Sequence, residues 1–216
     1  MNNPLSYIMI KKNTMHQDGI DALVECADKE FESKELGVFD QDKSVVGGES
    51  IFCVNKDIRD VKGVNFKELD NDIDKWVRHL FLNVVNPFYG FNVEQYSWPS
   101  LLKYEIGGHY KEHIDADQEV KVGTGEIVYK KVSERDLSLV LFLNDDYEGG
   151  DLVFLDQNIK IKPEPGLLVT FPSTYNYPHK VEPVTKGTRY AMVWWATILG
   201  FPTVKDEDEE FKRKYG

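Results

Sequence analysis

Short apolar segments recur from Phe91 onward, each closed by a turn signal, and this pattern constrains the fold most strongly. Turn-forming pairs separate them at Gly149-Gly150, Pro165-Gly166 and Lys186-Gly187. The segments are Leu101–Ile106, Leu137–Leu143, Leu152–Leu155, Leu167–Phe171 and Arg189–Ile198. Runs this short suit strands better than helices, and many strands at this spacing predict a jelly-roll or barrel-like double sheet.

The first part of the chain has a mixed pattern. Ser6 to Lys11 alternates like a short strand, whereas Asp18–Phe31 and Phe66–Val85 carry apolar residues at helical spacing. These helices are expected to brace one sheet from outside. The predicted α+β chain is a single domain with three parts: a helical and strand support region at 1–90, a β core at 91–200 and a charged tail at 201–216, expected to be solvated or frayed.

Composition narrows the class of protein. Hydrophobic residues make up 41% of the chain, enough for a sizeable core, and the net charge is -11 with a pI near 5.0. An acidic balance argues against nucleic acid as the main partner. The sequence contains no apolar run long enough for a membrane span and no signal peptide, so no membrane partner and a cytosolic location are expected. Cys26 and Cys53 are expected to be small buried hydrophobes.

Two histidines and an aspartate form the strongest candidate for a metal site. His113 precedes Asp115 by two residues in HYKEHIDAD, and residues two apart on a strand project from the same face. The third donor is expected to be His179, in YPHKVEPV. Two histidines and one carboxylate leave three positions open, as in non-haem Fe(II) oxygenases, whereas hydrolytic zinc sites keep one open. The H-x-D pattern alone also fits a surface strand with polar ends.

Arg189 is the candidate anchor for an anion. A hairpin centred on residues 185–187 would pair Pro183 with Arg189. His179 and Arg189 would then share one face, roughly 13 Å apart. A small dicarboxylate that chelates the metal would meet the guanidinium at its other end, because the planar fork of arginine matches a carboxylate. The alternative is an ion pair with one of the 37 acidic side chains.

Three stretches carry a family resemblance: YEIGGHYKEHID, RDLSLVLFLNDDYEGGDLVF and PHKVEPVTKGTRYAMVWW. From about Trp98 to Trp195, the chain resembles the prolyl 4-hydroxylase-like branch of the 2-oxoglutarate/Fe(II) dioxygenase superfamily. The shared order is strand, H-x-D, loop, strand, Gly-Gly turn, distal histidine and basic residue. This resemblance implies a double-stranded β-helix (jelly-roll) core with N-terminal supporting helices.

The resemblance also implies roles for individual residues. His113, Asp115 and His179 would be the iron ligands and catalytic residues. Arg189 would bind the far carboxylate of 2-oxoglutarate, at a position where many prolyl hydroxylases carry lysine. The implied cofactors are Fe(2+), 2-oxoglutarate and O2, with ascorbate as reductant, and the implied reaction is hydroxylation of an unactivated C–H bond with release of succinate and CO2.

Four further side chains near these motifs are candidates for a role in the site or in packing. Tyr104 matches a family tyrosine that contacts the co-substrate, and Trp195 matches an aromatic position that lines the pocket; core packing is the alternative for both. His109 shares strand parity with His113 but has no ligand role in the family pattern. Asp117 is expected to begin a solvated loop.

Residues 117–136 are polar and contain glycine, which predicts a mobile loop or hairpin closing over substrate. The family branch favours a proline-containing peptide or protein as substrate. The alternatives are hydroxylation of lysyl residues or a free amino acid, or a non-catalytic binding module. A nucleic-acid demethylase of the AlkB-like branch fits less well, because Trp195 stands where that branch typically carries a second arginine.

Overall fold

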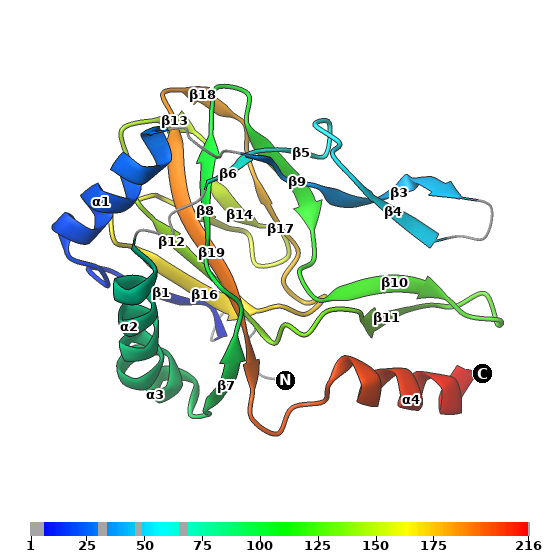
Figure 1. Cartoon of the computed structure of the whole chain (residues 1–216). Helices are drawn as coiled ribbons and strands as arrows, with labels where there is room; N and C mark the ends of the chain where they lie inside the picture. Colours follow the sequence, from blue (N-terminus) through cyan, green and yellow to red (C-terminus); the bar gives the residue numbers. More distant parts are fainter. Residues whose placement is uncertain (1–6, 30–33, 46–48, 65–68, 216) are drawn as a thin grey trace.

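Two β-sheets form the core of the part of the chain that the computed structural model describes, residues 7–29, 34–45, 49–64 and 69–215 (Figure 1). The larger sheet runs in the order β1 (Met9–Lys11), β16 (Leu168–Pro172), β12 (Leu137–Phe142), β19 (Arg189–Ile198), β8 (Ser100–Tyr104), β6 (Lys62–Val64) and β2 (Lys34–Glu35), with β7 (Val93–Tyr96) beside β19. The smaller sheet runs in the order β15 (Ile159–Ile161), β14 (Leu152–Phe154), β17 (His179–Val181), β9 (His109–His113) and β5 (Arg59–Asp60).

Three two-stranded ladders complete the strands of the described residues. They are β3 (Val38–Val45) with β4 (Glu49–Cys53), β10 (Asp117–Lys121) with β11 (Ile127–Lys131), and β13 (Glu148–Gly149) with β18 (Val184–Lys186). The β3–β4 and β10–β11 hairpins extend from the same side of the two sheets (Figure 1). The predicted jelly-roll core is confirmed.

Helices cover the outer face of the larger sheet. They are α1 (Gln17–Asp28), α2 (Asp70–Leu80), the π-helix η3 (Phe81–Val85) and α3 (Asn86–Tyr89). The apolar side chains predicted to lie on one face of each helix are buried or half-buried, and Leu23 on α1 and Val77 on α2 are fully buried. The predicted ends at Phe31 and Phe66, and the start of the first strand at Ser6, lie outside the described residues.

Side-chain alternation along the larger sheet separates a structural face from a functional face. On β12, Leu139 and Leu141 pack in the cluster beneath the helices, whereas Val140 and Phe142 pack in the cluster between the sheets. Ser138 shares the parity of Val140 and Phe142, so it faces the inter-sheet space. The same two-residue period lets a single strand serve both the core and a site.

Three expectations differ from the observed structure. Strands β1, β2, β5 and β6 pair into both sheets, so residues 1–90 contribute to the β core itself. Cys26 and Cys53 are half-buried rather than buried. The tail forms helix α4 (Val204–Tyr215), which has no buried residue. In the described part of the chain, no helix is long and apolar enough to cross a membrane.

The charged tail is helical because its ends are well capped. The Thr203 hydroxyl accepts a hydrogen bond from the Asp206 backbone N–H, and the Asp206 carboxylate accepts one from the Thr203 N–H. This reciprocal cap satisfies donors that a helix start leaves free. Acidic residues in the first turn and basic residues in the last turn also favour the helix dipole.

Candidate active site

His113 and His179 face each other as a cross-strand pair in the smaller sheet. They are register partners of β9 and β17, with ring centroids 4.2 Å apart. Asp115 lies just after β9, in a bend, so its convergence with His113 comes from this turn and not from strand parity as predicted. Its carboxylate lies 3.6 Å from His113 Nε2 and 3.7 Å from His179 Nε2. One donor atom from each residue lies within 4.8 Å of the others.

Backbone carbonyls orient both imidazoles. His113 Nδ1 lies 2.8 Å from the Lys111 carbonyl oxygen, and His179 Nδ1 lies 3.1 Å from the Tyr177 carbonyl oxygen. A carbonyl can only accept, so each Nδ1 carries the proton and each neutral ring keeps its lone pair on Nε2. Both lone pairs therefore lie on the nitrogens nearest Asp115, as in sites where a second contact fixes the ligand tautomer.

Asp115 is held by contacts from the larger sheet. The Ser138 hydroxyl donates a hydrogen bond of 2.6 Å to its carboxylate and lies 2.7 Å from the Ser173 hydroxyl. Arg135 Nη1 donates to the Asp115 backbone carbonyl at 3.1 Å. The Trp195 side chain also hydrogen-bonds this carboxylate, so contacts from the larger sheet fix its orientation beside the two imidazoles.

The charges of the three groups suit a divalent metal. Burial lowers the pKa of His113, and the neighbouring His179 lowers it further, so the His113 ring is neutral at ordinary pH. Burial alone would raise the pKa of Asp115, but His179, His113 and the Ser138 hydrogen bond outweigh it and lower that pKa. Two imidazoles and an ionised carboxylate form the donor set that a non-haem iron site uses.

Arg189 lies on the larger sheet, in the same cavity as the three donors. It is 1% exposed, and its guanidinium lies 4.7 Å from the Tyr104 ring centroid and 5.1 Å from that of Phe142. Its Nε and Nη1 have no hydrogen-bond partner among the described residues. Buried guanidinium nitrogens without an acceptor are costly, so Nε and Nη1 of Arg189 fit an anionic ligand.

The hairpin predicted between His179 and Arg189 is wrong. β17 pairs with β14 and β9, whereas β19 pairs with β12, β8 and β7. The two residues therefore belong to opposite sheets and share one cavity. Residues 185 and 186 belong instead to β18, which pairs with β13. The chain then crosses from the smaller sheet to the larger one. Sequence spacing alone cannot distinguish such a crossover from a hairpin.

Glycines near the β13–β18 ladder permit close packing behind Arg189. Gly149 and Gly150 have φ values of 74° and 63°, in the left-handed region that glycine favours. A Cβ on Gly150 would lie 3.0 Å from Arg189 Cδ, and one on Gly149 would lie 2.3 Å from the Pro183 carbonyl oxygen. The Gly-Gly turn therefore leaves room for the arginine stem.

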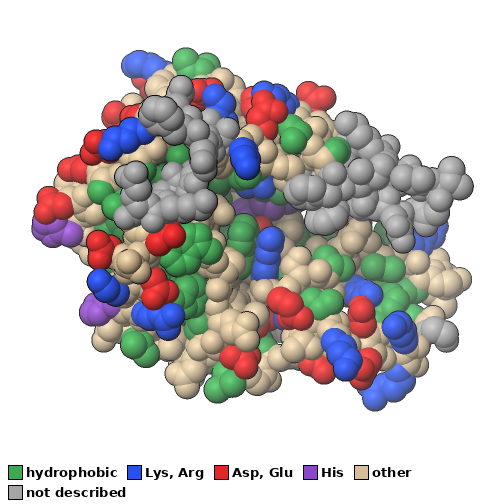
Figure 2. Space-filling view, in the orientation of Figure 1, with side chains coloured by type: hydrophobic (Ala, Val, Ile, Leu, Met, Phe, Trp, Pro, Cys, Tyr) green, Lys and Arg blue, Asp and Glu red, His purple; other side chains and the backbone are tan. Residues whose placement is uncertain are grey.

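The cavity has a volume of about 1120 Å³ and lies between the sheets. In the space-filling view a hollow opens in the middle of this face, with histidine and basic side chains inside it (Figure 2). Both remaining predicted residues, Tyr104 and Trp195, line the cavity. Tyr104 is the register partner of Arg189, and Trp195 that of Ser138, so both site strands are fixed in register by β19.

Several cavity residues were missed by the sequence analysis. The Tyr110 ring stacks on His113 with centroids 3.6 Å apart, although residues three apart on a regular strand face opposite ways. A register shift between β9 and β17, as in a β-bulge, explains how the Tyr110 and His113 side chains reach the same face. The Arg135 guanidinium lies 3.8 Å from the Trp195 ring, and that of Arg59 lies 4.7 Å from the Tyr110 ring.

Some of these residues could have been identified from the sequence. Ser138 is the lone polar residue in an apolar strand, and Arg135 is a charge directly before it. Both positions were readable as candidates. His109 bonds the Gly107 and Asp57 carbonyls away from the donors, in line with its exclusion. Asp117 begins β10, and its carboxylate accepts the Tyr175 N–H at 2.7 Å, so it is not the start of a solvated loop.

Comparison with known proteins points to a family. The sequence model of the 2OG-Fe(II) oxygenase superfamily matches residues 99–197, which contain all three donors and Arg189. Residues 99–197 therefore resemble this superfamily in sequence. Over 69 residues the chain is 42% identical to prolyl 3-hydroxylase 2 of Homo sapiens, and the match covers 30% of this chain and 10% of that protein. Over 105 residues it is 39% identical to a PKHD-type hydroxylase of Psychrobacter, covering 47% of this chain and 38% of that protein.

Solved structures support the fold of this chain. A prolyl-4-hydroxylase of Pseudomonas putida matches with a TM-score of 0.58 and 19% identity, over 89% of this chain and 93% of that one. A prolyl hydroxylase of Trichoplax adhaerens, solved with a peptide fragment, matches with a TM-score of 0.54 and 17% identity, over 98% and 88%. The chain spans less than half the length of the curated relatives named above.

The residues present fit the two groups that the superfamily name implies. Donor atoms about 2.1 Å from one ion lie about 3 to 4 Å apart, which suits the measured separations around Asp115. The unpartnered buried guanidinium of Arg189 suits the distal carboxylate of 2-oxoglutarate. His113, Asp115 and His179 would hold the iron, and Arg189 with Tyr104 would hold the co-substrate.

Proposed function

We infer that the protein hydroxylates an unactivated C–H bond of a peptide or protein, using iron(II), 2-oxoglutarate and O2, and that prolyl residues are its preferred target. One observation carries this proposal: three metal donors and an unpartnered buried arginine share one cavity. The family resemblance supports the reaction class, and the printed names of the relatives support the prolyl target. Ascorbate as reductant and a cytosolic location remain predictions.

Each side chain has a distinct task in this reaction. His113, Asp115 and His179 bind one face of the ion and leave three positions for ligands. Arg189 neutralises the far carboxylate of the co-substrate in a dry pocket, and the Tyr104 ring packs beneath its guanidinium. Bound iron supplies the oxidation of 2-oxoglutarate to succinate and CO2 and the transfer of oxygen to the substrate.

The opposite side of the cavity is suited to the substrate backbone. Arg135, stacked on Trp195 and bonded to the Asp115 carbonyl, is partly buried next to the donors. Its remaining N–H groups can donate to a peptide carbonyl and so position the target residue near the metal. The β10–β11 hairpin also borders the cavity, because Gln118, Glu119 and Tyr129 line it.

Turnover with a peptide panel tests the proposal. The protein would be supplied with Fe(II), 2-oxoglutarate, ascorbate and O2, together with proline-rich peptides, lysine-containing peptides or free amino acids. We expect succinate release and addition of one oxygen atom to the proline-rich peptides, both abolished in His179→Ala. Hydroxylation of lysine or a free amino acid would replace the prolyl assignment. A protein that binds metal but releases no succinate with any substrate would be a non-catalytic module.

A further inference from the structure

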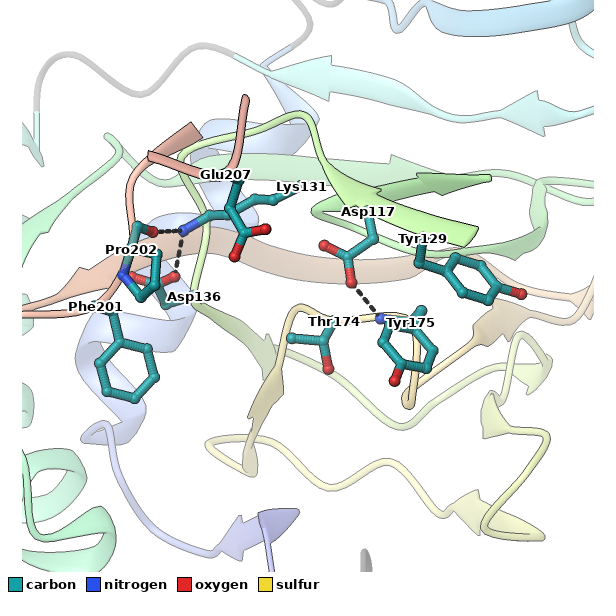
Figure 3. Close-up of a pocket in the computed structure, with 9 residues that line it drawn as sticks. All are labelled: Asp117, Tyr129, Lys131, Asp136, Thr174, Tyr175, Phe201, Pro202 and Glu207. Atoms are coloured by element: carbon teal, nitrogen blue, oxygen red, sulfur yellow. Dashed lines mark hydrogen bonds and ion pairs between the residues drawn. The ribbon is translucent and has the colours of Figure 1, made fainter. Parts of the chain in front are cut away.

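A second, smaller pocket lies beside the catalytic cavity (Figure 3). Its volume is about 220 Å³, enough for one long side chain but not for a second substrate molecule. Asp117, Tyr129 and Tyr175 line both cavities, so the smaller one adjoins the larger. Its far wall comes from Pro202, just before α4, and from Glu207 in the first turn of α4. We call this space the side pocket.

The side pocket carries excess negative charge. Lys131 and Asp136 form a closed pair with 2.6 Å between Nζ and Oδ1, and their side chains are 11% and 9% exposed, so their charges cancel. Among the described residues, Asp117 and Glu207 form no ion pair with a cation. The Asp117 and Glu207 carboxylates point into the pocket from opposite walls (Figure 3). The pocket therefore favours a positively charged occupant.

An aromatic wall lies beside these carboxylates. The Tyr129 and Tyr175 rings are stacked, with centroids 4.5 Å apart and planes 6° from parallel. The Tyr129 hydroxyl donates to Glu119 at 2.9 Å, which fixes the ring. Ring faces attract ammonium and guanidinium groups, and they also pack against the methylene stem of a long side chain. Carboxylates and ring faces together suit lysine or arginine.

Helix α4 contributes Glu207 to the far wall of the side pocket. The helix buries no residue, so it adds little to the core. It is nevertheless fastened to β11, because Lys130 Nζ lies 2.5 Å from Asp208 and 5.2 Å from the Phe211 ring centroid. The Val204 N–H also donates to Glu134 at 2.9 Å. These contacts hold Glu207 opposite Asp117.

We propose that the side pocket binds a lysyl or arginyl side chain of the substrate peptide, at a fixed position relative to the hydroxylated residue. This inference rests on the proposed peptide hydroxylase function and adds a specificity site to it. The side pocket adjoins the catalytic cavity and shares three lining residues with it, so a peptide whose target residue lies at the metal can place a flanking side chain there. The net charge of -11 also favours encounter with a basic partner.

Peptide binding without turnover tests the pocket. Fluorescein-labelled alanine-based peptides would carry one proline and either lysine or glutamate at one of four positions on each side. Dissociation constants would be measured by anisotropy with the protein loaded with Mn(II) and 2-oxoglutarate in the absence of O2. At one position we expect the lysine peptide to bind roughly tenfold more tightly than the glutamate peptide. Glu207→Gln and Asp117→Asn should each reduce that ratio several-fold.

Glu209→Gln is the matched control, because Glu209 is exposed on the same helix and pairs with Lys205 outside the pocket. It should keep the wild-type ratio. A lysine-to-glutamate ratio near one at every position, or a ratio unchanged in both pocket variants, would overturn the proposal, as would a failure of all peptides to bind. Peptides that bind with the expected preference yet are never hydroxylated would instead contradict the proposed function and support the pocket.

Discussion

The Ser138 hydroxyl determines how the only carboxylate donor is oriented. It donates to Asp115 at 2.6 Å from the opposite sheet, and it helps to lower the pKa of Asp115. We expect Ser138→Ala to weaken Mn(II) or Fe(II) binding by roughly 10- to 100-fold, because the carboxylate loses the contact that fixes its rotamer. Metal titration by calorimetry measures this change. Ser173→Ala, whose hydroxyl contacts the Ser138 hydroxyl, should have a smaller effect; equal affinity in Ser138→Ala and wild type would rule out the orienting role.

Replacement of Arg189 separates ligand binding from stability. Arg189→Met removes a buried charge that has two unpartnered nitrogens, so the ligand-free protein should keep or raise its melting temperature. Binding of 2-oxoglutarate should weaken by about 2–5 kcal/mol, because its far carboxylate loses a desolvated partner. Arg189→Lys should bind 2-oxoglutarate with an affinity between those of wild type and Arg189→Met, because lysine keeps the positive charge but lacks the planar guanidinium. A destabilised Arg189→Met that still binds 2-oxoglutarate normally would make Arg189 a structural residue.

The β10–β11 hairpin is the element predicted to cover bound substrate, and its hairpin form is observed. Its register allows a clean shortening: deleting Val120–Lys121 together with Ile127–Val128 removes two opposed pairs and preserves side-chain parity. We expect the KM for peptide to rise roughly tenfold, because the cover over the cavity is shortened. Succinate release without peptide should change little. An unchanged peptide KM would show that the hairpin does not contact substrate.

For the whole molecule, the metal and co-substrate should act as a clamp between the two sheets. His113 and His179 lie on the smaller sheet, whereas Arg189 lies on the larger one, so a ligand that touches all three joins them. For the Mn(II)-loaded protein, 2-oxoglutarate at about 100 times its dissociation constant should add about 2.7 kcal/mol to the free energy of unfolding. That corresponds to a rise in melting temperature of about 5–11 °C. Scanning calorimetry measures it, and His179→Ala should show almost none of the rise.

Local pattern was sufficient for much of the fold. The range Arg189–Ile198 is a strand with those same limits, and the apolar stripes at residues 18–31 and 66–85 are the buried faces of helices. Both results depend on the period of side chains along a single segment, which the sequence displays directly. Family motifs also singled out His113, Asp115, His179 and Arg189 before their positions in space were known.

Only the tertiary structure decided how those residues meet. Strand pairing between distant segments made His179 the partner of His113, set Arg189 on the opposite sheet and shifted the register beside Tyr110. Pairing depends on the free energy of the whole packed core, so the spacing between two residues in the chain does not reveal it. The side pocket has the same origin, because its walls come from a hairpin and a terminal helix that share no sequence pattern.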